Sequence, residues 1–76
     1  MEDLLAYIAK GLVDRPEEVQ VEAFEEDDAL VLELTVAEDD TGKVIGRNGR
    51  TVNAIRTVMR ACGAKQERRV LVDVVD

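Results

Sequence analysis

The sequence has no histidine or tryptophan, one cysteine, one proline, and only two aromatic residues, Tyr7 and Phe24. Without histidine, a catalytic thiol at Cys62 would lack its usual base. A single cysteine cannot form an internal disulfide, which favours a reducing compartment. Two aromatic rings leave little material for the base-stacking platforms that many nucleic-acid-binding folds use. We therefore expect a non-catalytic protein that needs no metal and no cofactor.

Long apolar runs are missing as well. The first three residues, Met1-Glu2-Asp3, are acidic and lead directly into an amphipathic pattern, unlike a signal peptide or a membrane span. We expect a cytoplasmic protein with no membrane association. The chain has 76 residues, 46% of them hydrophobic, and shows no linker, repeat or low-complexity segment. Residues 1–76 are therefore predicted to form a single domain.

Charge is distributed unevenly along the chain. The formal net charge of −7 argues at first against a nucleic-acid partner. Residues 41–69, however, carry eight Lys and Arg against one Glu, a net charge of +7, whereas the rest of the chain carries −14. This polarity predicts a basic face for phosphates and an acidic remainder that limits non-specific binding. From charge alone, a solvated helix face is the alternative.

Hydrophobic spacing predicts a helix near the N-terminus. Within residues 3–13, Leu4, Ile8 and Leu12 recur every four positions, as on one face of a helix. Proline disfavours helical geometry in the residue before it, so Pro16 predicts that this helix ends by Arg15.

The next two segments predict an antiparallel hairpin. Residues 19–25 and 30–36 each alternate in the period of two that is typical of strands. The acidic run 25–28 between them predicts a short turn, and strands joined by so short a turn pair antiparallel.

The second half of the chain predicts two helical pieces and a final strand. We expect a brief helix over 41–45 with Asp40 as its N-cap, and a longer one over 50–62 that ends at Gly63. Alternating valines predict a strand over 69–75. The apolar face of the longer helix consists of Val52, Ile55, Met59 and Cys62, all predicted to pack in the core.

These elements predict an α+β domain in the order helix–strand–strand–helix–helix–strand. A helical crossover separates the second and third strands, so they should pair in parallel with a right-handed connection. We therefore expect a three-stranded mixed sheet with three helices on one face. The other face would meet solvent or a partner.

The stretch with the most specific pattern is Thr41-Gly42-Lys43-Val44-Ile45-Gly46-Arg47-Asn48-Gly49-Arg50. Gly46 and Gly49 allow positive φ angles and a close approach of a ligand to the backbone. The loop leads into a helix start, where unpaired backbone N–H groups and the helix dipole favour anions. Lys43, Arg47 and Arg50 add positive charge there. This combination predicts that phosphates bind to the loop amides and the three cations.

Apolar and polar neighbours of the loop complete the predicted site. The apolar wall against which unstacked bases would lie, in part also core, consists of Val44, Ile45, Val52 and Ile55. Asn48 is predicted to contact the nucleic-acid backbone, with helix capping as an alternative or additional role. Arg56 lies on the exposed side of the longer helix, either at the rim of this site or on a solvated face.

A family resemblance adds to this pattern. Val44-Ile45-Gly46-Arg47-Asn48-Gly49, followed by Val52 and Ile55, resembles KH domains, in which a GXXG loop contacts about four nucleotides of RNA backbone. The element order resembles the type II, prokaryotic form. The whole chain is similar to the small bacterial stand-alone KH proteins of the KhpA (YlqC) family.

This resemblance implies a cytoplasmic protein that binds single-stranded RNA as a general RNA-binding or chaperone factor. It also implies homodimerisation or pairing with a second KH protein, KhpB. We expect about four bases to lie between the helices and the strand at 70–74. The alternative is an adaptor that keeps the fold but binds protein only. Arg47 and Asn48 argue against it, because an inactive loop could carry acidic residues there.

Overall fold

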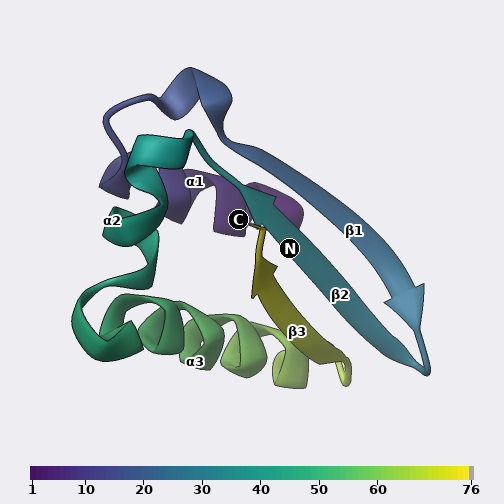
Figure 1. The fold of residues 1–76 in the computed structure, drawn as a ribbon. Helices are drawn as coiled ribbons and strands as arrows, with labels where there is room; N and C mark the ends of the chain where they lie inside the picture. Colours follow the sequence, from purple (N-terminus) through teal and green to yellow (C-terminus); the bar gives the residue numbers. More distant parts are fainter. Residues whose placement is uncertain (76) are drawn as a thin grey trace.

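A computed structural model of the chain describes residues 1–75 and confirms the predicted order of elements (Figure 1). The helices are α1 (Glu2–Leu12), α2 (Thr41–Ile45) and α3 (Arg50–Lys65), and the strands are β1 (Gln20–Glu26), β2 (Ala29–Thr35) and β3 (Arg69–Val74). Short 3-10 helices lie at Pro16–Glu18, Glu38–Asp40 and Arg47–Gly49. Within the described residues, no helix combines the length and the apolar character needed to cross a bilayer.

The sheet has the predicted mixed topology. Its strand order is β1-β2-β3, with β1 antiparallel to β2 and β2 parallel to β3, so β3 is an edge strand. Asp27 and Asp28 connect the hairpin with φ angles of 49° and 66°. Positive φ at both central residues is the geometry that matches the twist of a two-residue hairpin, and Asp tolerates it better than most residues.

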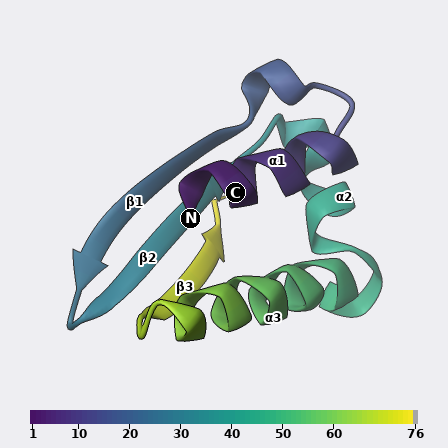
Figure 2. The ribbon, with the colours of Figure 1, turned by 180° about the vertical axis from the view of Figure 1, so that it is seen from behind.

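The core lies between the sheet and the helices: α1 and α3 pack against the sheet, and α2 lies next to both of these helices (Figure 2). Its buried members come from every helix and from β2, β3 and the segment after β2: Leu5, Ala9, Leu32, Leu34, Val36, Val44, Ile55, Met59, Val70 and Val72. The apolar positions of β1 pack against this cluster only partly. The opposite sheet face is open, with Phe24 and Leu71 exposed by 41% and 40%.

The end of α3 differs from the prediction. Gly63 does not end the helix, which continues to Lys65. A Cβ atom on Gly63 would lie 2.6 Å from both the Arg68 carbonyl oxygen and Val70 Cγ2. Glycine is therefore needed here for the close approach of α3 to β3. The Arg68 N–H donates to the Gly63 carbonyl at 2.8 Å, which turns the chain directly into the last strand.

Two smaller differences concern α1 and the cysteine. The helix α1 ends at Leu12, before Arg15, because Val13 is already extended with φ −99° and ψ 162°. The prediction that Cys62 is fully buried is wrong, since the residue is only half-buried.

Candidate nucleic-acid interface

The loop between α2 and α3 depends on backbone conformations that favour glycine. Gly46 has φ 77° and ψ 173°, a region that is essentially restricted to glycine. A Cβ atom on Gly46 would also collide with the Thr51 side chain. Asn48 and Gly49 both adopt left-handed conformations, with φ 58° and φ 75°. The two glycines therefore allow the chain to leave α2 and enter α3 within a few residues.

The backbone amides of this loop fall into two groups. The Gly46 N–H donates to the Gly42 carbonyl at 2.9 Å, and the Gly49 N–H donates to the Gly46 carbonyl at 3.2 Å. The expectation that these two amides are available to phosphate is therefore wrong. For the N–H groups of Arg47 and Asn48, no acceptor outside the helices is found among residues 1–75, and the non-helical Gly46 (φ 77°, ψ 173°) interrupts the helical hydrogen bonds that would otherwise reach them. The amides at the tip of the loop are thus the ones that a phosphate can reach.

Asn48 does not act as a helix cap. The N-cap position of α3 is Gly49, and no side chain makes a capping hydrogen bond there. Asn48 is exposed, as are Arg47 and Arg50 on either side. Neither arginine forms an ion pair within the described residues. Two uncompensated positive charges and one polar side chain therefore surround the accessible amides.

Lys43 is held differently from these arginines. Its ammonium group forms ion pairs with Asp14 and, at 3.4 Å, with Asp40. The positive charge predicted for phosphate binding at Lys43 is thus compensated by two carboxylates of the chain itself. This arrangement assigns Lys43 primarily to the contact between α2 and the segment after α1.

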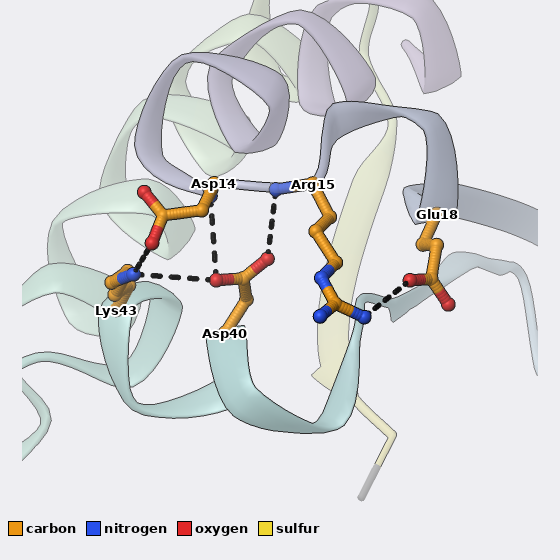
Figure 3. A network of polar contacts seen from close by, with 5 residues as sticks. All are labelled: Asp14, Arg15, Glu18, Asp40 and Lys43. Carbon is orange, nitrogen blue, oxygen red and sulfur yellow. Dashed lines mark hydrogen bonds and ion pairs between the residues drawn. The ribbon is translucent and has the colours of Figure 1, made fainter.

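Asp40 is the centre of that contact (Figure 3). It is only 2% exposed, and its carboxylate accepts the backbone N–H groups of Arg15 at 3.0 Å and Asp14 at 3.3 Å. Asp40 occupies the N-cap position of α2 as predicted, but its side chain makes no capping hydrogen bond to that helix. It connects the start of α2 to the end of α1, a role that no local sequence pattern indicates.

The network of Asp40 and Lys43 is charged at neutral pH. Burial alone would raise the pKa of Asp40, but the N–H donors of Arg15 and Asp14, together with the Lys43 ammonium, hold that pKa below its ordinary value. The hydrogen bond to Asp14 raises the pKa of Lys43 above its ordinary value, although desolvation acts in the opposite direction. The start of α2, and with it the following loop, is therefore positioned by an ionised cluster.

The predicted apolar wall is mostly part of the core. Val44 is fully buried, so the prediction that it lines the site is corrected: it has no surface to offer a base. Val52 and Ile55 are each 5% exposed and can present only an edge. Ile45 is half-buried and is the most accessible of the four.

A pocket of about 250 Å³ lies farther along α3, beside the edge strand. It is lined by Arg56, Arg60 and the β3 residues 70–73. The Arg56 Nε–H donates to the Val72 carbonyl at 3.0 Å, which holds this side chain against the strand. Arg56 follows Arg50 by six residues, about 9 Å along a helix, so the pocket and the loop lie along one helix. Within residues 1–75, no cluster of three or more His, Cys, Asp or Glu side chains is suited to a metal ion.

The family model described as KhpA/KhpB, KH domain, matches residues 2–74. An RNA-binding protein KhpA from Clostridium acetobutylicum is 49% identical over 75 residues, which is 99% of this chain and all of that protein. A protein of the same name from Halalkalibacterium halodurans is 46% identical over the full length of both chains. Another, from Borreliella burgdorferi, is 45% identical over 97% of this chain and 90% of its own length. No solved structure matches significantly.

Proposed function

This chain belongs to the KhpA/KhpB KH-domain family, and we propose that it binds single-stranded RNA with the loop Gly46–Gly49 as the main phosphate contact. Relatives that match nearly all of the chain are named RNA-binding proteins. A KH domain contacts about four nucleotides of backbone through such a loop. The proposed function is therefore non-catalytic binding of a short single-stranded segment.

The observation that carries this proposal is the tip of the loop. The N–H groups of Arg47 and Asn48 have no acceptor outside the helices within the described residues, and both side chains are exposed. Adjacent backbone amides next to unpaired arginines are a favourable site for a phosphate oxygen, because hydrogen bonds to a charged acceptor are stronger than neutral ones. Gly46 and Gly49 maintain this geometry and carry no side chain that would block the backbone of a ligand.

We propose that the RNA continues from the loop along α3 towards β3. Arg50, Arg56 and Arg60 lie in this direction, with about 15 Å between the first and the last along the helix axis. Ile45 and the accessible edges of Val52 and Ile55 supply apolar contact for bases. Lys43 contributes mainly by fixing α2, and Val44 by filling the core beneath the loop.

One short groove gives modest affinity for RNA, so we expect two KH domains to bind the same RNA together. Linking two such grooves raises the effective concentration of the second site without any new contact. We propose that the protein acts as a homodimer or with a second KH protein of the KhpB type, as a general RNA-binding or chaperone factor in the cytoplasm. The charge division described above would then direct RNA to the basic side of each domain.

The test is a titration of fluorescently labelled single-stranded RNA at two salt concentrations. The double variant Arg47→Asp/Asn48→Asp lowers the net charge by three and preserves the left-handed conformation, which Asp tolerates. The matched control Lys10→Asp/Gln20→Asp makes the same change in charge at exposed positions of α1 and β1. We expect the loop variant to lose binding while remaining folded, and the control to retain most of it.

Wild-type affinity should also fall as the salt concentration rises. The slope of log affinity against log salt concentration should be about −0.7 for each phosphate contacted in a single strand. Equal affinity of the wild type and the loop variant would contradict the proposal. It would favour the alternative in which the fold serves protein contacts only.

A further inference from the structure

The outer edge of β3 carries the backbone groups that a base in the pocket would meet. The Val75 N–H donates to the Leu34 carbonyl of β2 at 2.8 Å, so the backbone groups of Val75 point towards β2. Along a strand, the backbone N–H and C=O groups of successive residues point alternately to one edge and to the other. Those of Val70, Val72 and Val74 therefore lie on the outer edge. The hydrogen bond from Arg56 to the Val72 carbonyl agrees with this assignment.

Without Arg56, Val72 would offer one donor and one acceptor side by side. This pair matches the Watson–Crick edge of adenine, which has an acceptor at N1 and an amino donor at N6. In the structure, the Arg56 Nε–H occupies the Val72 carbonyl at 3.0 Å. A carbonyl oxygen has a second lone pair, but an amino group that approached it would also approach a full positive charge.

We propose that Arg56 converts this edge into a site that mainly donates hydrogen bonds, so that the pocket selects pyrimidines, uracil or cytosine, over adenine. This inference rests on the proposed RNA-binding function and states which bases the pocket prefers to adenine. The guanidinium has five N–H donors, of which Nε–H is used on Val72 and another is 3.4 Å from Asn53 Oδ1. The remaining donors and the Val72 N–H face acceptors such as uracil O4 or cytosine O2 and N3.

The other lining residues agree with this selectivity. Arg60 also lines the pocket and is a second cation with donors only. Asp73 carries the one acidic side chain of the lining, but alternation along β3 directs that side chain to the open face of the sheet, away from α3. The pocket volume of about 250 Å³ is below the range of typical small-molecule sites and suits a single base.

The experiment compares labelled runs of uridine, cytidine and adenosine of equal length. We expect the wild type to bind both pyrimidine runs about tenfold more tightly than the adenosine run, because one unfavourable or missing hydrogen bond to a charged group has about this effect. In Arg56→Met, which keeps the length of the side chain, all affinities fall, but the ratio of pyrimidine to adenosine binding falls towards one.

Lys65→Met is the matched control, because it removes the same charge from an exposed side chain of the same helix that does not line the pocket. Its ratio should stay within about twofold of the wild-type ratio, since only the electrostatic contribution is lost. Equal binding of all three runs by the wild type would overturn the inference but leave the proposed function intact. An unchanged ratio in folded Arg56→Met would also overturn it. If no run binds, the proposed function fails and the inference with it.

Discussion

The carboxylate of Asp40 accepts the backbone N–H of Arg15 at 3.0 Å, although the two residues are 25 positions apart in the sequence. A second hydrogen bond from the Asp14 N–H and the ion pair with Lys43 complete the contact. It joins the end of α1 to the start of α2, which in turn leads into the proposed phosphate loop. The geometry of the loop thus depends on a buried charge outside the GXXG motif.

We predict that Asp40→Asn lowers the melting temperature at neutral pH by roughly 5 °C or more, because an amide replaces a charged acceptor of two N–H groups. The pKa of Asp40 is depressed in the folded state, so its contribution is present above the ordinary value of 3.8 and is lost as the pH falls through the lower folded pKa. Thermal melts of both proteins between pH 7 and pH 3 measure this difference.

The difference in melting temperature between the wild type and Asp40→Asn should therefore become smaller below about pH 4. Asp39→Asn is the matched control, since Asp39 is the exposed neighbour in the same 3-10 helix. It should melt close to the wild type at every pH. A gap of constant size from pH 7 to pH 3 would contradict the role assigned to the Asp40 charge.

The second prediction concerns the contact between α3 and β3. Gly63→Ala should destabilise the protein by about 1–3 kcal/mol, because the new methyl group would lie too close to the Arg68 carbonyl and Val70. Gly11→Ala serves as the control: no atom lies within 4 Å of its added Cβ, and Ala is the better helix former by about 1 kcal/mol. Urea denaturation should show opposite signs for the two variants, and equal effects would contradict the close-packing explanation.

The fold was largely predictable because its signals are local. The spacing of Leu4 and Ile8, the alternation in the two hairpin strands and the valines of β3 each indicate one element and one buried face. Gly63 was assigned wrongly for a related reason: glycine near a helix end is a stop signal, but glycine is equally required where a strand packs tightly against a helix. Only the spatial neighbour distinguishes the two cases.

The site was predictable as a motif but not as a network. Gly46 and Gly49 indicate the loop, and Arg47 and Arg50 indicate its charge, because both signals lie within a few residues. The partners of Lys43 and Asp40 come from the segment after α1, and sequence spacing carries no information on such long-range pairs. The bond between Arg56 and Val72 was missed for the same reason.

The third prediction tests the loop backbone. Gly46→Ala should destabilise the protein by about 2 kcal/mol or more, because alanine at φ 77° and ψ 173° is strained and its Cβ would collide with Thr51. Gly42→Ala, in the neighbouring α2 with no atom within 4 Å of its added Cβ, should be neutral or slightly stabilising. Chemical denaturation gives both values, and equal tolerance of alanine at both positions would contradict the conformational role of Gly46.

The last prediction separates the two kinds of cation near the loop. Arg50 is exposed and has no ion pair among the described residues, whereas Lys43 is paired with Asp14 and Asp40. Arg50→Gln should therefore weaken RNA binding several-fold and reduce the salt slope by about 0.7, the value of one phosphate contact. Lys43→Gln should lower the melting temperature but leave the salt slope nearly unchanged, because its charge is already compensated. If Lys43→Gln instead reduces the slope as much as Arg50→Gln while stability stays constant, Lys43 leaves its carboxylates to bind phosphate, and the assignment made here is wrong.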